Sequence, residues 1–137
     1  MTTAPLPQFR RTVSLPVYAV IGAVLWFVFA LLIRLIGPSV FVPGTAALAP
    51  TFLGLIPVSA LAVWLTARLG RVQGQSLINA MSIMSFTAML LDGVAVTWFP
   101  ALYGLTGTPL ALAAAWLLWG VGCCQLIAYL WGGRSDS

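Results

Sequence analysis

Two residues of opposite charge, Arg34 and Asp92, lie inside long apolar segments of a chain that is 61% hydrophobic and only 6% charged. Two further arginines, Arg68 and Arg71, share one short polar connection. A charged side chain in hydrocarbon costs about 2.5–3.5 kcal/mol by insertion scales, so an acid and a base kept there indicate a specific role. The available chemistry is an ion pair, or a carboxylate that binds a cation or a proton.

Asp92 ends a row of polar side chains on one segment. Asn79, Ser82, Ser85 and Asp92 follow at spacings of three, three and seven residues, which places them on one broad helical face. One interpretation is a polar lining that leads to an ionisable group, as in transporters. The other is hydrogen bonding between helices, at about 0.6 kcal/mol per bond. The carboxylate favours a functional role for part of the row.

Arg34 is the candidate partner of Asp92. Counted from the middle of each segment at about 1.5 Å per residue, both lie in the same half of the membrane, with an axial offset of roughly 6–7 Å. That offset is within the reach of an arginine side chain, so we expect a buried Arg34–Asp92 pair. In the alternative, Arg34 extends to the headgroups and Asp92 is protonated or bonds another helix.

The composition excludes several kinds of chemistry. The chain has no His, Lys or Glu, which removes an imidazole base, a lysine Schiff base and a glutamate-driven proton antiporter. We expect no metal, no cofactor and no enzymatic activity. The two cysteines, Cys123 and Cys124, are adjacent, and neighbouring helical side chains point about 100° apart, so we expect small buried hydrophobes rather than a disulfide.

Four apolar segments account for most of the chain, which we treat as a single domain over residues 1–137. They cover residues 15–36, 48–69, 76–99 and 109–131. Each is long enough to cross a hydrocarbon core of about 30 Å. We expect Gly37-Pro38, Gly70, Pro100 and Gly132-Gly133 to end them. The predicted fold is therefore an all-α membrane bundle of four antiparallel helices, with short disordered tails over residues 1–12 and 134–137.

The arginines predict the orientation of the bundle. Arg10 and Arg11 precede the first segment, Arg68 and Arg71 flank the middle turn, and Arg134 follows the last segment. The other two connections carry no charge. By the positive-inside rule, both termini and the middle turn face the cytoplasm, which would make this a multi-pass membrane protein.

The aromatic residues fit the same frame. We assign Trp98, Phe99 and Tyr103 to the outer membrane boundary, and Tyr129 and Trp131 to the inner one. Four tryptophans are deeper, and they either line a ligand cavity or, as we expect, pack against helices and lipid: Trp26, Trp64, Trp116 and Trp119.

One stretch resembles a known family. Leu90-Leu91-Asp92-Gly93, then Trp98-Phe99-Pro100 and Tyr103-Gly104, are similar to a signature of bacterial four-helix membrane proteins classed as a domain of unknown function. The resemblance implies an inner-membrane protein and draws attention to Asp92, but it implies no activity. The chain also has the size of small multidrug transporters, although the glutamate those proteins carry in their first helix is missing here.

Three functional hypotheses follow. In the first, the protein binds or transports a small molecule or ion between the first and third helices, with Asp92 as the ionisable group, Arg34 as its partner and Asn79, Ser82 and Ser85 as the polar lining. In the second, it is a non-catalytic accessory subunit of a larger membrane complex. A membrane enzyme acting on lipids or quinones is the third. The bilayer, another copy of the chain or a membrane-complex subunit are the expected partners, and nucleic acid is not.

Overall fold

The computed structural model describes residues 13–135 and consists of four long helices with one short 3₁₀ turn in the described chain. The elements are α1 (Leu15–Val40), α2 (Leu48–Gly70), α3 (Gln75–Trp98), the 3₁₀ turn η1 (Pro100–Leu102) and α4 (Gly107–Ser135). All four α-helices are long and apolar enough to cross a membrane. The all-α, four-helix membrane fold predicted from the sequence is confirmed.

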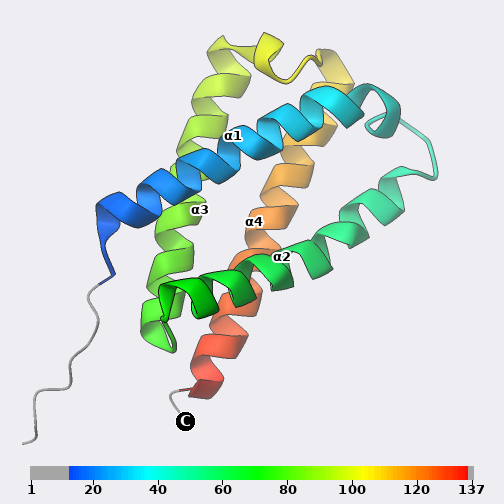
Figure 1. The fold of residues 1–137 in the computed structure, drawn as a ribbon. Helices are drawn as coiled ribbons and strands as arrows, with labels where there is room; N and C mark the ends of the chain where they lie inside the picture. The colour runs from blue at the N-terminus through cyan, green and yellow to red at the C-terminus, as the bar shows by residue number, and fades with distance from the viewer. Residues whose placement is uncertain (1–12, 136–137) are drawn as a thin grey trace, which may run out of the picture.

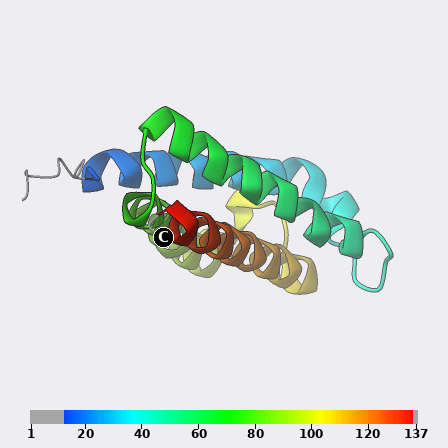
Figure 2. The same ribbon diagram turned by 90° about the horizontal axis from the view of Figure 1, so that it is seen from below.

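The helices form two layers. Figure 2 shows α1 and α2 in one layer and α3 and α4 in the other, and Figure 1 shows the first pair crossing over the second. The main packing interfaces are α1 against α3, α2 against α4 and α3 against α4. In contrast, α1 and α2 make almost no contact with each other. The α1–α2 layer is therefore held by the layer beneath it.

Glycines allow the closest helix approaches. A Cβ atom on Gly22 of α1 would lie 2.7 Å from the carbonyl oxygen of Met84 on α3. A Cβ atom on Gly132 of α4 would lie 2.7 Å from the carbonyl oxygen of Gly74, just before α3. Both distances are too short for any larger residue, so glycine at these positions permits backbone-to-backbone packing of the kind that membrane helices use.

Two helix ends differ from the prediction. Helix α1 continues through Pro38 to Val40 instead of stopping at Gly37, and the Phe41 amide then caps it at the Gly37 carbonyl. Helix α4 continues through Gly132-Gly133 to Ser135, so residues 134 and 135 are helical rather than part of a tail. Gly132 packs against another helix, and membrane helices tolerate glycine and proline well. The predicted tail at residues 1–12, with Arg10 and Arg11, lies outside the described residues.

The core divides into two clusters along the bundle. One is built around Ile33, Phe41, Tyr103 and Trp116, and the other around Tyr18, Val63, Leu77 and Met81. Their separation leaves the middle of the bundle less densely filled. The candidate site lies there.

Candidate functional site

Asp92 accepts two hydrogen bonds from neutral donors. The Tyr103 hydroxyl donates to its Oδ1 at 2.5 Å, and the Trp26 indole Nε1 donates to the same oxygen at 2.8 Å. Trp26 Nε1 also lies 3.3 Å from the Tyr103 hydroxyl oxygen, which closes the triangle. Among the described residues no donor reaches the second oxygen, Oδ2. Helices α1 and α3 and the turn after η1 thus meet at one carboxylate that keeps a free acceptor.

Tyr103 is the buried member of this group. It lies just after η1, outside the spanning helices, with 1% of its surface exposed. Burial, with the hydrogen bond to Asp92, raises the pKa of Tyr103 above its ordinary value. The phenol therefore keeps its proton and remains a donor to Asp92. The sequence predicts Tyr103 at the outer aromatic boundary; the residue lies just beyond α3, but its ring packs into the core and its hydroxyl bonds a partner inside.

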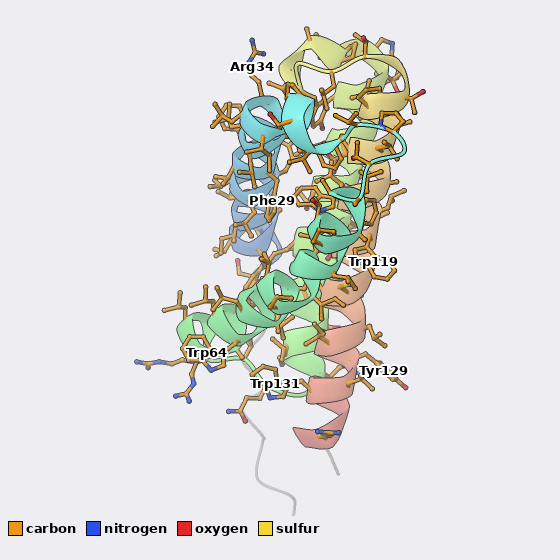
Figure 3. All side chains as sticks on the ribbon, turned by 90° about the vertical axis from the view of Figure 1, so that its right-hand side faces the viewer. Phe29, Arg34, Trp64, Trp119, Tyr129 and Trp131 are labelled. Atoms are coloured by element: carbon orange, nitrogen blue, oxygen red, sulfur yellow. The ribbon has the colours of Figure 1, made fainter. Side chains whose placement is uncertain are left out.

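Arg34 does not pair with Asp92. Its Nη1 donates to the carbonyl oxygen of Ala101 in η1 at 2.8 Å, and the side chain is exposed. Figure 3 shows Arg34 at the end of the molecule where the yellow segment containing η1 lies. In place of the predicted ion pair, Arg34 forms a hydrogen bond that joins α1 to η1. Axial depth was compatible with a pair, but the carbonyls of η1 offer Arg34 an acceptor nearer to water.

The rest of the predicted polar row divides into two parts. Ser82 Oγ donates to Gln125 Oε1 at 3.2 Å, and Gln125 Nε2 donates to Ser85 Oγ at 2.7 Å. Asn79 is exposed and accepts from Gln75 Nε2 at 3.0 Å. Ser82 and Ser85 therefore join α3 to α4, as in the hydrogen-bonding interpretation, and Asn79 belongs to the first turns of α3. Only Asp92 and Ser85 border the cavity described next.

A cavity of about 110 Å³ lies among the four helices. Its wall is almost entirely apolar, and three aromatic side chains contribute to it: Trp26, Phe29 and Trp116. Figure 3 shows Phe29 pointing into the bundle. The oxygen-bearing side chains of the wall are Ser59, Ser85 and Asp92. An apolar cavity with a few convergent polar groups is the usual form of a small-molecule site.

The exposed part of the cavity wall lies on α1 and α2, from which we infer that the mouth of the cavity lies between these helices. Of the residues that line the cavity, only Leu25 of α1 and Val58 of α2 are exposed, by 37% and 44%. Both stand near the middle of their helices, and these helices barely touch. An opening at mid-helix faces the hydrocarbon of a membrane rather than water. We had placed the site between the first and third helices, whereas all four helices line it.

Asp92 also borders a second space. This second space measures about 240 Å³ and is a groove on the outer face of α3 and α4, where its lining residues Gly93, Thr97 and Leu118 are exposed. Asp92, Leu117 and Val121 line both spaces and form the partition between them. Asp92 thus lies between the cavity inside the bundle and a groove on its outer face.

The sequence did not single out three residues of this region. Trp26 was one of four deep tryptophans without a distinguishing feature. Tyr103 was placed at the membrane boundary, and Gln125 was overlooked although it is the sole Gln or Asn within the fourth segment. That isolation was a usable signal for Gln125. Of the deep tryptophans, Trp26 and Trp116 line the cavity, whereas Trp64 and Trp119 are exposed on α2 and α4.

Two cysteines also lie on α4, close to the cavity. Cys123 and Cys124 are free thiols, half-buried rather than fully buried, and Cys124 lines the cavity. Within residues 13–135, no group of three or more metal-ligating side chains gathers. Comparison with known proteins found no matching family model, no similar curated protein and no similar solved structure.

Proposed function

We propose that this multi-pass membrane protein binds a small molecule in the cavity among its four helices, with Asp92 as the polar anchor. We place both termini in the cytoplasm, on the distribution of its arginines. A bacterial inner membrane is proposed only on the resemblance of Leu90–Gly93 and Trp98–Gly104 to bacterial four-helix membrane proteins, for which no matching family model was found. The proposal is for a binding or transport protein rather than an enzyme.

One observation carries the proposal: a carboxylate with a free oxygen borders an apolar cavity. The two donors to Oδ1 hold the carboxyl group in one orientation, and they leave Oδ2 available. A carboxyl group needed only for packing would be satisfied on both oxygens or replaced by an apolar residue, because an unpartnered polar atom in an apolar environment is costly. A bound molecule with a donor group would complete the set.

The position of Asp92 between the cavity and the groove extends the proposal to transport. A molecule held at Asp92 in the cavity would reach the outer groove between α3 and α4 after a rearrangement of Leu117 and Val121, which line both spaces.

Native mass spectrometry of the untagged protein, extracted gently from its own membrane, tests the proposal. We expect a reproducible non-lipid adduct on the wild-type chain that is absent from Asp92→Asn. Asn79→Ser, which alters an exposed amide outside the cavity, should retain the adduct. An adduct that persists in Asp92→Asn would overturn the role of Asp92. Recovery of the chain in fixed stoichiometry with other proteins, without an adduct, would favour the accessory-subunit hypothesis instead.

Two alanine-to-leucine variants, one inside the cavity and one outside it, provide a second test of the proposal. Ala88→Leu adds bulk to the cavity wall, whereas Ala115→Leu makes the same change on an exposed face of α4 that borders neither the cavity nor the groove. Loss of the adduct in Ala88→Leu alone would locate the molecule in the cavity. Equal retention by both variants would place it elsewhere.

A further inference from the structure

We infer that the ligand of this cavity is a small lipophilic amine that enters from the bilayer between α1 and α2 and is held as its ammonium ion by Asp92. This inference rests on the proposed function and names its class of ligand. Three features carry it: the missing counter-charge of Asp92, the aromatic lining, and the position of the mouth.

The first feature is that Asp92 has no cationic partner among the described residues. Its donors are an indole and a phenol, both neutral. The nearest candidate, Arg34, bonds the carbonyl oxygen of Ala101. Ionisation of Asp92 without a counter-charge is costly in an apolar environment, so the empty site favours the neutral carboxyl group, and an amine that becomes a cation there makes the ionised form favourable. An anionic ligand would add to the cost of ionisation.

The second feature is the aromatic lining. Trp26, Phe29 and Trp116 line the same cavity as Asp92. The faces of aromatic rings attract ammonium groups, most strongly where water is excluded. A metal ion fits poorly here, because hard cations need about six oxygen ligands and the cavity wall has three oxygen-bearing side chains. A sugar would leave most of its hydroxyl groups without partners.

The third feature is the mouth at Leu25 and Val58. A molecule that enters there comes through hydrocarbon, so it must be soluble in lipid. An amine meets this condition as the neutral base. In the cavity its nitrogen takes the proton of the Asp92 carboxyl group, so that an N–H bond forms as the O–H bond breaks. Both charges then appear together as a pair, and no isolated charge crosses the hydrocarbon.

The volume limits the size of the group inside. A cavity of about 110 Å³ is somewhat smaller than the engineered apolar cavity of about 150 Å³ known to accept benzene. The ammonium group and a few carbons therefore fill the space, and the rest of the molecule extends through the mouth into lipid.

The test uses two probes of nearly equal shape, N,N-dimethylbenzylamine and isobutylbenzene. Binding is titrated to the full chain in phosphatidylcholine nanodiscs, with empty nanodiscs subtracted. We expect the amine to bind at least about tenfold more tightly than the hydrocarbon. Asp92→Asn should abolish this preference, and Ala88→Leu should weaken both probes. Ala115→Leu should bind both as the wild type does.

The outcomes separate the inference from the proposed function. If both probes bind equally to the wild type and Ala88→Leu excludes both, the amine is overturned while a ligand cavity stands. If neither probe binds above empty nanodiscs, the amine is overturned, and the adduct in native mass spectrometry decides the proposed function by itself. If Asp92→Asn cannot be purified, the wild type alone tests the inference: tighter binding of the amine than of the hydrocarbon supports it, and equal binding overturns it.

Discussion

At the residue scale, Asp92 is defined by the asymmetry of its two oxygens. Both neutral donors, Trp26 and Tyr103, converge on Oδ1, so that half of the carboxyl group is engaged and the other half is available. The arrangement fixes the direction of Oδ2 without supplying a positive charge. A ligand group thus meets an acceptor whose orientation was set before binding, which lowers the entropic cost of association.

Removal of one donor should loosen this orientation. Tyr103→Phe keeps the buried ring and deletes the hydroxyl that bonds Asp92. A hydrogen bond between neutral groups contributes about 0.5–1.5 kcal/mol, so we expect a loss of unfolding free energy within that range. Reversible unfolding in mixed micelles measures it. Tyr129→Phe, an exposed tyrosine, serves as the control and should change little; equal losses in both variants would contradict the role of the hydrogen bond.

The same phenol predicts a pH dependence. The pKa of Tyr103 is raised from its ordinary value of 10.0 in the folded protein. Above pH 10 the unfolded chain releases the Tyr103 proton while the folded chain, with its raised pKa, still retains it. The free energy of unfolding therefore falls as the pH rises. The contribution is therefore complete below about pH 10 and is lost above it. The difference in unfolding free energy between wild type and Tyr103→Phe should shrink from pH 8 to pH 11. A constant difference would contradict the assignment.

At the element scale, α3 organises the molecule. It packs against α1 on one side and α4 on the other. Its polar side chains are distributed accordingly: Ser82 and Ser85 bond Gln125 of α4, whereas Asp92 bonds Trp26 of α1. Helix α3 thus bonds α4 within its own layer through Ser82 and Ser85, and bonds α1 in the other layer through Asp92.

The bond between α3 and α4 should contribute measurably to stability. Gln125→Leu removes two hydrogen bonds between these helices and leaves a side chain of similar size. At about 0.6 kcal/mol per bond in a membrane, we expect a loss of about 1 kcal/mol. Gln75→Leu, which removes an exposed bond within α3, is the matched control and should change stability less. If the leucine at position 125 is instead neutral or stabilising, the two bonds are dispensable.

Elements were more predictable than their contacts. Apolar runs and their breaks located all four helices, and the largest errors arose at Pro38 and Gly132-Gly133. Those residues usually end helices in water, but in this chain the helices pass through them. The sequence also singled out Asp92. It could not identify the partners of Asp92, because depth along a helix says nothing about which faces of two helices meet. Tyr103 was missed for the same reason: a loop residue can turn inward as readily as toward the membrane surface.

At the scale of the whole molecule, the charges are unevenly placed. Arg68, Arg71 and Arg134 lie at the ends of α2 and α4, and Arg34 lies near the opposite end of α1, beside η1. Three arginines at one end against one at the other agree with a cytoplasmic middle turn and carboxyl terminus. Arg34, tied to a carbonyl oxygen, is positioned to meet headgroups on the far side.

Cysteine labelling tests this orientation. In a chain with Cys123→Ala and Cys124→Ala, a single cysteine is introduced at Gln73→Cys or Thr106→Cys, both exposed and in different connections. A membrane-impermeant maleimide should label the Thr106→Cys protein in intact cells whose outer membrane has been opened. The Gln73→Cys protein should react only after the inner membrane is broken. The reverse pattern would place both termini outside.

The gap between α1 and α2 has a consequence for the membrane around it. Leu25 and Val58 are exposed where α1 and α2 make almost no contact, so in a membrane we expect lipid acyl chains to cover the cavity there. A vacant cavity is then in contact with lipid tails, and any incoming molecule competes with them for the same opening. Chain length, unsaturation and lateral pressure should alter affinity with no change in the protein. The lipid composition of the membrane therefore influences how readily a ligand reaches the cavity.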